Sequence, residues 1–268
     1  MKKNNSDIKK AKLILGLIMT GVAFLIGIIS IFYTPYDPNA ISVTEKFMAP
    51  GAKHIMGTDN LGRDIFSRVM VGMGTTIRIS GITILISSIL GLIIGLISGY
   101  TGGNFDEIIM RINDGVASIP AILLAMVFIG MLGRGTNTVT IALSIAFIPS
   151  FARVARGEVM NYKHCDYIKS AKLSGAGNMR ILLFHILPNI KNTYMAAIAT
   201  GFNNAVLAEA GMSYMGIGVM PPTPSLGEML SSSQSFWGTA PWYAIFPGLT
   251  IIYLVISLVI LTDSMKIS

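Results

Sequence analysis

The chain alternates between long apolar runs and shorter polar segments. Runs with few or no charges cover residues 13–36, 77–100, 108–132, 136–153, 193–216 and 243–262. Each run is close to the roughly 20 residues that an apolar helix needs to cross a bilayer. The pattern therefore predicts an all-α, polytopic membrane protein in which six transmembrane helices form a single domain over residues 1–268.

Glycine and proline refine this pattern within the runs. Gly91, Gly95 and Gly99 recur every fourth residue, which places small residues on one face of the second span and favours close helix packing. Pro120 lies inside the third run and is expected to bend it, because proline cannot donate the backbone hydrogen bond of a helix.

The composition agrees with a membrane protein. Hydrophobic residues make up 52% of the chain and charged residues only 12%, whereas soluble domains carry about 25% charged residues. The net charge of +7 could suggest a nucleic-acid partner. The basic residues, however, lie beside apolar runs, as the positive-inside rule describes. The one cysteine, Cys165, excludes an internal disulfide and a zinc-type cysteine cluster.

The distribution of charge predicts the orientation. Residues 153–191 hold seven Lys or Arg and two Asp or Glu, against five and four in 37–78. We therefore place 156–191 in the cytoplasm and the loops 37–75 and 217–241 outside. The lysine-rich residues 1–12 are also placed inside, so both termini are expected in the cytoplasm of a plasma or inner membrane protein. The first run is too long for a signal peptide and is interpreted as a retained span.

The longest polar interruption is 160–191. It predicts two short helices, at about 164–173 and 179–187, separated by a glycine-containing break that allows φ > 0. Asn178 is expected to cap the second helix, and Pro188 to start or kink the next helix. A helix of about ten residues spans only about 15 Å. It is too short to cross a bilayer but long enough to dock into a groove of a partner.

No motif predicts nucleotide binding or catalysis by this chain. The phosphate-binding pattern G-x-x-x-x-G-K-[ST] is absent, and the pair Gly72 and Gly74 lacks the third glycine of a dinucleotide loop. No G-x-S-x-G turn presents a nucleophile either. The sequence therefore predicts neither an enzyme nor a cofactor bound by this chain.

A few residues are candidates for a translocation path or a metal. Glu209 is a charge inside a span, which is costly in lipid, so it is interpreted either as a path or gate residue or as a locally paired residue near the outer interface. Met212 and Met215 could offer thioether ligands, or simply fill irregular packing space. His54 could meet an incoming ion outside. Adjacent residues at 164–166 contain metal-binding chemistry but cannot all face one ion on a helix.

Two sets of charges are interpreted as structural. Asp59, Arg63, Asp64 and Arg68 have spacings that allow pairing across one turn of a capped helix at the interface, which would lead into the second span. Arg111 and Asp114 lie three residues apart near the start of the third span. We expect them to pair with each other.

Five blocks of sequence resemble one family, the inner-membrane permeases of the peptide/nickel ABC importers, and in particular the second permease of each pair. The blocks are 57–68 (GTDNLGRDIFSR), 173–177 with 187–188 (LSGAG, LP), 209–219 (EAGMSYMGIGV), 221–227 (PPTPSLG), and 240–242 with 246–249 (APW, FPGL). They follow the expected order along nearly the whole chain.

The resemblance implies a role for the polar interruption. Such permeases carry a cytoplasmic loop with the pattern E-A-A, a glycine, an isoleucine and L-P, which docks on an ATPase. Here Lys169 and Ser170 replace the glutamate and the first alanine. The residues expected to couple this chain to the ATPase are Lys169, Ala171, Gly175, Ala176, Gly177, Leu187 and Pro188.

The resemblance also implies partners and a substrate class. The partners are a homologous second permease, two cytoplasmic ATP-binding subunits that carry ATP and Mg, an extracytoplasmic solute-binding protein and the lipid bilayer. The loop and the segment after the fifth span look more like the nickel-type permease, so we expect nickel or another transition metal, or a metal chelate, with di- or oligopeptides as the alternative. Rival classes are a stand-alone secondary transporter, which would show internal repeats that we do not find, and a non-transporting scaffold.

Overall fold

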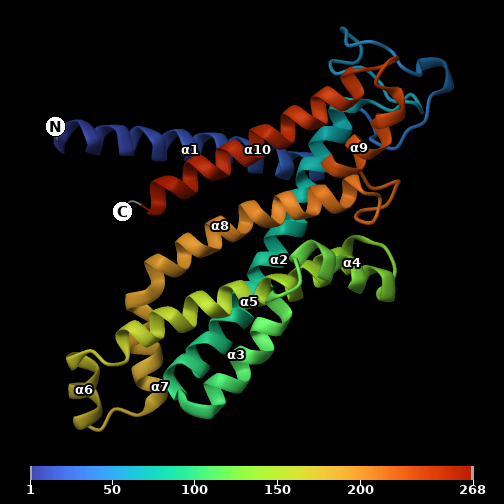
Figure 1. Cartoon of the computed structure of the whole chain (residues 1–268). Coiled ribbons are helices and arrows are strands. Elements are labelled where there is room, and N and C mark those ends of the chain that lie inside the picture. The colour runs from blue at the N-terminus through green and yellow to red at the C-terminus, as the bar shows by residue number, and fades with distance from the viewer. Residues whose placement is uncertain (1, 267–268) are drawn as a thin grey trace.

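The computed structural model describes residues 2–266, with side chains from 10 to 264, and this part of the chain is helical without a strand (Figure 1). The helices are α1 (Lys2–Phe32), α2 (Ile65–Thr101), α3 (Gly103–Ala117), α4 (Ala121–Leu132), α5 (Thr136–Tyr162), α6 (Asp166–Leu173), α7 (Asn178–Ile181), α8 (Leu187–Tyr214), α9 (Leu226–Ser233) and α10 (Trp242–Lys266), with 3₁₀ turns at Val43–Glu45 and Gln234–Phe236 and a π-helical turn at Leu182–Ile186. The predicted all-α class is confirmed.

The six predicted spans are confirmed only in part. Four of the described helices, α1, α2, α5 and α10, are long and apolar enough to cross a membrane. The pair α3 and α4 gives a fifth span if it is counted as one, although the two helices meet at an angle of 83°. The remaining predicted span lies on α8, which has 28 residues and is therefore about 42 Å long, but which is less apolar than the others.

Helix α2 begins earlier than the hydrophobic pattern indicated. Asp64 is its N-cap, and the Asp64 carboxylate accepts a hydrogen bond from the backbone N–H of Ser67. The helix then continues for 37 residues, or about 55 Å, which exceeds a hydrocarbon core of about 30 Å. Of the residues expected in an interfacial helix, Asp59 and Arg63 lie in a loop, whereas Arg68 belongs to the same continuous helix as the second span. The first turns of this helix overlap the segment 37–75 that was expected to be a loop.

Helices α2 and α5 pack closely along the glycine face of α2. A Cβ atom on Gly95 would lie only 2.5 Å from the carbonyl oxygen of Ala152, and one on Gly91 would lie 2.9 Å from the Ala152 backbone nitrogen. Gly99 faces Val159, two turns farther along α5. The close packing predicted from the glycine spacing is confirmed.

The third predicted span is broken rather than bent. Helix α3 ends at Ala117, and Pro120 is the N-cap residue of α4, where its missing N–H costs no hydrogen bond. The predicted change of direction at Pro120 is thus confirmed, but the helix ends and a new one begins instead of bending. Asn113 stabilises the arrangement, because its amide donates to the carbonyl oxygen of Pro149 on α5 at 3.3 Å.

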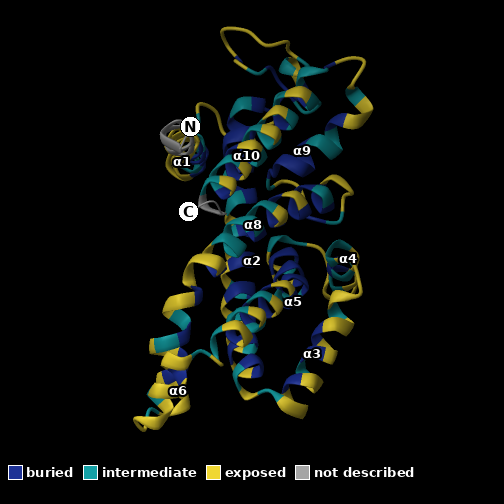
Figure 2. Ribbon diagram, turned by 60° about the vertical axis from the view of Figure 1, so that its left-hand side comes forward, coloured by how far each residue is buried: buried dark blue, intermediate teal, exposed yellow. Residues whose placement is uncertain are grey.

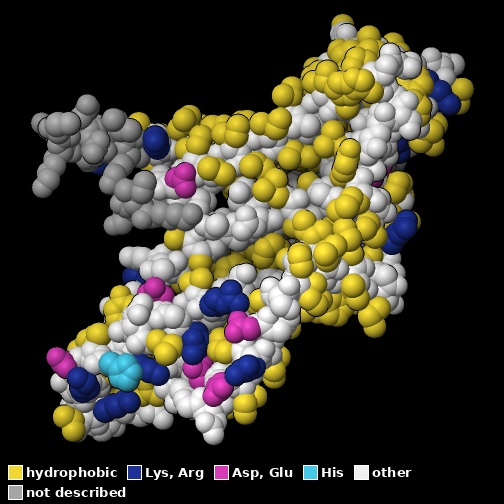
Figure 3. Space-filling model, in the orientation of Figure 1, with side chains coloured by type: hydrophobic (Ala, Val, Ile, Leu, Met, Phe, Trp, Pro, Cys, Tyr) yellow, Lys and Arg dark blue, Asp and Glu magenta, His cyan; other side chains and the backbone are white. Residues whose placement is uncertain are grey.

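The first and last helices lie against each other on one side of the bundle (Figure 1). Their backbones approach closely at Gly16, where a Cβ atom would lie 2.8 Å from the backbone nitrogen of Leu261. Much of α1 is exposed (Figure 2), and hydrophobic side chains cover the visible surface of this region (Figure 3). Such a surface is suited to lipid or to another membrane chain.

Candidate functional site

The part of the predicted cytoplasmic loop 156–191 that is expected to dock on an ATPase, here called the coupling segment, comprises residues 166–188. It lies at one end of the molecule, where α6 projects beyond the ends of α3 and α5 (Figures 1 and 2). Lys, Arg, Asp and Glu side chains gather on this end, in contrast to the hydrophobic surface of the opposite half (Figure 3). The first predicted short helix is present as α6. The second, predicted at about 179–187, is not a separate helix, because α7 has only four residues and continues through the π-helical turn into α8.

The turn after α6 has the geometry of a Schellman motif. The N–H of Ala176 donates to the carbonyl of Ala171, and the N–H of Gly175 donates to that of Lys172, both at 3.0 Å. Gly175 has φ of 84°, in the left-handed region where a glycine has no Cβ penalty. The predicted glycine break is therefore confirmed. It also places Ala171, Gly175 and Ala176 in one hydrogen-bonded turn.

The start of the second short helix differs from the prediction. Gly177, in an extended conformation, is the N-cap residue, and Asn178 is already helical. The Asn178 side chain instead accepts a hydrogen bond from the Tyr100 hydroxyl of α2 at 3.0 Å. The prediction that Asn178 caps this helix was wrong, because the side-chain oxygen of Asn178 accepts a hydrogen bond from Tyr100 of α2 and not from a backbone N–H of α7.

The coupling segment runs directly into α8. A π-helical turn, Leu182–Ile186, joins α7 to α8, and Pro188 lies in the first turn of α8. This is the position where the missing N–H of a proline is tolerated. The prediction that Pro188 starts the next helix is confirmed, while the π-helical turn before it could not be expected from composition.

Part of the coupling segment is packed against the adjacent ends of three long helices. Ile168 and Ile181 are fully buried and join a hydrophobic cluster with Leu96 of α2, Val159 of α5 and Ile190 of α8. Burial of a large aliphatic side chain contributes about 1.5–3 kcal/mol. Lys172 adds a cation–π contact, with its ammonium 5.1 Å from the ring centroid of Tyr100. The segment is therefore attached to the long helices on several sides.

Other large apolar side chains of the coupling segment are exposed. Leu173, Phe184 and Met179 are 91%, 70% and 66% exposed. They are accompanied by the exposed pair Lys169 and Asp166, whose side chains lie 2.9 Å apart. The ammonium of Lys169 lowers the pKa of the Asp166 carboxylate, chiefly through this hydrogen bond. An apolar surface with a polar rim on a helix outside the apolar spans is typical of a protein interface.

The remaining predicted coupling residues lie on the same turn or at its end. Leu187 is partly buried beside the cluster just described, and Pro188 is exposed. Gly177 is exposed and has open space around it. The structure thus brings all seven predicted residues into one continuous stretch. Their contact with an ATPase stays a prediction.

Glu209 is fully buried, and its carboxylate has partners within the chain. The hydroxyls of Thr76 on α2 and Ser213 on α8 donate to its two oxygens at 2.7 and 2.8 Å. This is the local pairing that stood as the alternative to a path role. Met212 is fully buried in the core, whereas Met215 is half exposed beyond the end of α8. A path role for these three residues stays a prediction.

The block 57–68 of the resemblance forms a buried ionic cluster, not a row of pairs on a helix. Arg63 donates to Asp59 at 2.6 Å, as its spacing predicted, but in a loop. Arg68 does not pair with Asp64. Its fully buried guanidinium lies 3.2 Å from the carboxylate of Glu228 on α9 and 3.8 Å from that of Asp59. Sequence reasoning missed Glu228, because it lies 160 residues away from Arg68 along the chain.

His54 belongs to the same cluster and is not positioned to meet an external ion. It is buried, with its Nδ1 atom 2.8 Å from the carboxylate of Asp64 and its Nε2 atom 3.6 Å from that of Glu45. Glu45 is also in contact with Lys53, which lowers the pKa of the Glu45 carboxylate. The cluster ties the loop before α2 to the first turns of that helix.

Two further expectations about charged residues can be compared with the structure. Arg111 pairs with Glu107 at 3.4 Å and Asp114 with Arg153 of α5 at 2.8 Å, so the expected Arg111–Asp114 pair was wrong. Among the described residues, no group of three or more His, Cys, Asp or Glu side chains is arranged to hold a metal ion. This includes residues 164–166.

Comparisons with known proteins agree on one family. The family model described as "Binding-protein-dependent transport system inner membrane component" matches residues 91–266. A dipeptide transport system permease protein of Haemophilus influenzae is 36% identical over 259 residues, covering 94% of this chain and 88% of the relative. A glutathione transport system permease protein of Pectobacterium atrosepticum is 35% identical, covering 88% and 78%. A nickel transport system permease protein of Escherichia coli is 31% identical, covering 94% and 91%.

A solved structure supports the fold. The inward-facing MetNI methionine ABC transporter aligns with 73% of this chain and 93% of the solved chain at a TM-score of 0.60. Its sequence identity is 16%, so this likeness concerns the arrangement of helices alone. Together with the family model and the relatives, it shows that the chain belongs to the binding-protein-dependent inner-membrane permeases, within the peptide/nickel group of ABC importers.

Proposed function

We propose that this chain forms half of the translocation path of an ATP-driven importer and transmits the ATPase stroke through the coupling segment. As a permease subunit it is a multi-pass inner-membrane protein and not an enzyme. The observation that carries the proposal is the packing of the coupling segment. It exposes Leu173, Met179 and Phe184, and other side chains of it are packed on α2, α5 and α8.

This arrangement can transmit a movement because the segment and the spans share one packed core. Ile168 and Ile181 interlock with residues of three long helices, and close-packed cores shift between discrete arrangements rather than deforming continuously. A partner that grips the exposed side chains and moves by several ångströms would carry the adjacent ends of α2, α5 and α8 with it. ATP and Mg would be bound by that partner.

The family implies the remaining partners as well. A homologous second permease would complete the path, and a second ATP-binding subunit would grip it. An extracytoplasmic solute-binding protein would approach the end with the loop 37–64 and α9. In this orientation the charged end with the coupling segment lies in the cytoplasm, together with both termini. The positive-inside distribution of Lys and Arg supports this orientation.

We further propose that the substrate is a short peptide, with nickel as the alternative that the motif pattern favoured. The dipeptide permease of Haemophilus influenzae and the glutathione permease of Pectobacterium atrosepticum are 36% and 35% identical to this chain, whereas the nickel permease is 31% identical. Similarity along the whole chain supports a peptide, whereas the sequence blocks look nickel-like.

The proposal is tested by ATP hydrolysis of the reconstituted complex with its binding protein. The complex is titrated with a dipeptide, with Ni²⁺ and with a nickel chelate. We expect stimulation by the dipeptide and none by the metal. Stimulation by nickel alone would reverse the choice of substrate. A permease pair that does not bind the ATPase subunits at all would overturn the coupling proposal itself.

A further inference from the structure

Helix α2 carries two charged residues, Arg68 and Arg78, and their surroundings differ. Arg68 is fully buried and lies beside Glu228 and Asp59. Arg78, ten residues farther into the helix, is exposed and forms no hydrogen bond or ion pair with the described part of the chain. A charge in a membrane span is costly, so it usually faces a partner or a water-filled cavity. Arg78 therefore needs a partner outside this chain.

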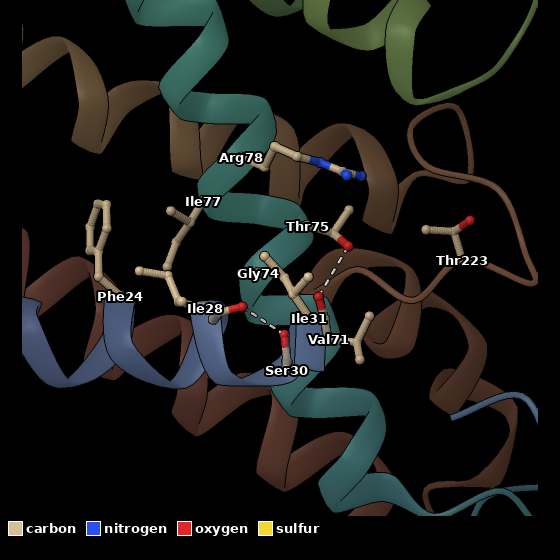
Figure 4. Close-up of a pocket in the computed structure, with 11 residues that line it drawn as sticks. Phe24, Ile28, Ser30, Ile31, Val71, Gly74, Thr75, Ile77, Arg78 and Thr223 are labelled. Carbon is tan, nitrogen blue, oxygen red and sulfur yellow. Dashed lines mark hydrogen bonds between the residues drawn. The ribbon is translucent and has the colours of Figure 1, made fainter. Parts of the chain in front are cut away.

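Arg78 lines a cavity of about 320 Å³ between α1 and α2 (Figure 4). Val71, Gly74, Thr75 and Arg78 recur at helical spacing and form the α2 wall of this cavity. Side chains of α1 form the opposite wall, and Thr223, in the segment before α9, lies at the side toward which Arg78 extends (Figure 4). Arg78 is the one charged residue among those that line the cavity.

The cavity adjoins a close crossing of α1 and α2. A Cβ atom on Gly27 would lie 3.2 Å from the Cα atom of Gly74, so the two backbones are nearly in contact. Gly27 lies five residues before the end of α1 at Phe32, and Arg78 lies four residues beyond Gly74. Arg78 therefore lies about one helical turn beyond this crossing, on the α2 wall of the cavity. Residues of α1, of α2 and of the segment before α9 line the cavity together with Arg78, which favours an anion that passes between these elements over a lipid phosphate at the bilayer surface.

The polar groups of the cavity define what that anion can be. The guanidinium has five N–H donors, no acceptor, and a planar fork that matches a carboxylate. The hydroxyls of Thr75 and Ser30 already donate to the carbonyls of Val71 and Gly27, at 3.0 and 2.7 Å. Of these three side chains, Arg78 alone has donors that are not already used within the chain, so it is the group that can bind a ligand. A free metal cation would be repelled by it.

We propose that Arg78 binds the C-terminal carboxylate of a peptide substrate during its passage, and so selects peptides with a free C-terminus. This inference rests on the proposed importer function and deepens its substrate class. Arg78 is a specificity-determining residue in it, with the cavity between α1 and α2 as the place where the carboxylate is held.

The first test compares two substrates in the reconstituted complex. ATP-driven uptake of a dipeptide and of its C-terminal amide is measured for the wild type, for Arg78→Gln and for Arg78→Lys. The selectivity of the binding protein cancels when the acid-to-amide ratio is compared between variants. A hydrogen bond to a charged group contributes about 1.5–3 kcal/mol. We therefore expect Arg78→Gln to lower the acid-to-amide ratio by about tenfold or more, and Arg78→Lys to lower it less. Arg134→Gln, in the exposed turn between α4 and α5, is the matched control and should leave the ratio unchanged.

The second test does not depend on the amide. Because Cys165 is the one cysteine of the chain, Arg78→Cys can be made in a Cys165→Ser background and treated with membrane-impermeant thiosulfonates of similar size. A cationic reagent should restore dipeptide uptake, and a neutral hydroxyl reagent should not.

The outcomes separate the alternatives. A residue that binds a lipid phosphate or an acidic side chain of the second permease would, when changed, reduce uptake of the acid and the amide equally, and this would overturn the inference. Lack of labelling at position 78, or equal rescue by both reagents, would overturn it as well. Absence of peptide uptake by the wild type would instead refute the proposed function.

Discussion

The Schellman turn after α6 offers a substitution whose effect is almost purely conformational. Gly175 has φ of 84°, and no atom lies within 4 Å of the position that a Cβ would take. Gly175→Ala therefore introduces strain without a steric clash. Gly177 is the matched control. It also has open space around it, but its φ of −69° is accessible to any residue.

The expected loss of affinity for the ATPase subunit follows from the backbone conformation at residue 175. The left-handed conformation costs an L-residue about 1–2 kcal/mol. In the free permease the turn can relax and release this strain, but docking of an ATPase subunit requires the bent form that positions Leu173 and Met179. The docking equilibrium of Gly175→Ala should then be about 5–30-fold weaker. Gly177→Ala should weaken it less, because it changes only the N-cap preference of α7 and introduces no left-handed strain. Gly175→Asn should also be milder than Gly175→Ala, because asparagine tolerates this conformation better.

The assay is a titration of the ATPase subunit onto the permease pair in lipid nanodiscs. It reports the dissociation constant directly, and the thermal unfolding of each variant serves as a check that the bundle is intact. If Gly175→Ala binds the ATPase as tightly as Gly177→Ala does, the turn has no role in docking and the reasoning is refuted.

Two further predictions concern the stability of the bundle, measured as thermal unfolding in detergent. Arg68→Met leaves the carboxylate of Glu228 buried without its cation and should cost about 3–5 kcal/mol, whereas Arg111→Met, at an exposed pair, should cost about 0–1 kcal/mol; equal losses would contradict the burial argument. Gly95→Ala forces the backbones of α2 and α5 apart and should cost about 1–3 kcal/mol, while Gly115→Ala, with open space around it, should cost nothing. A tolerated Gly95→Ala would show that the two helices are not in contact there.

The sequence predicted those features that depend on local pattern. Apolar runs located the long helices, and the four-residue spacing of glycines located the α2–α5 contact. Gly175 located the turn after α6, and Pro188 located the start of α8. These features depend on helical periodicity and on the backbone preferences of single residues. They do not require knowledge of which distant elements meet.

The features that the sequence did not predict depend on distant partners. Asn178 looked like a helix cap but bonds to Tyr100, which lies 78 residues earlier in the chain. Arg68 looked like the partner of a carboxylate one turn away but lies beside Glu228. The sharp break at Pro120 and the π-helical turn before α8 depend on packing between helices, which no local rule describes.

The most direct test of the central claim is dipeptide accumulation by proteoliposomes that hold the complete complex. The binding protein and labelled dipeptide are supplied on one side, and ATP on the side of the coupling segment. The account predicts accumulation against a gradient only when ATP is present on that side. Equal accumulation driven by a proton or sodium gradient without ATP would contradict it and would indicate a stand-alone secondary transporter.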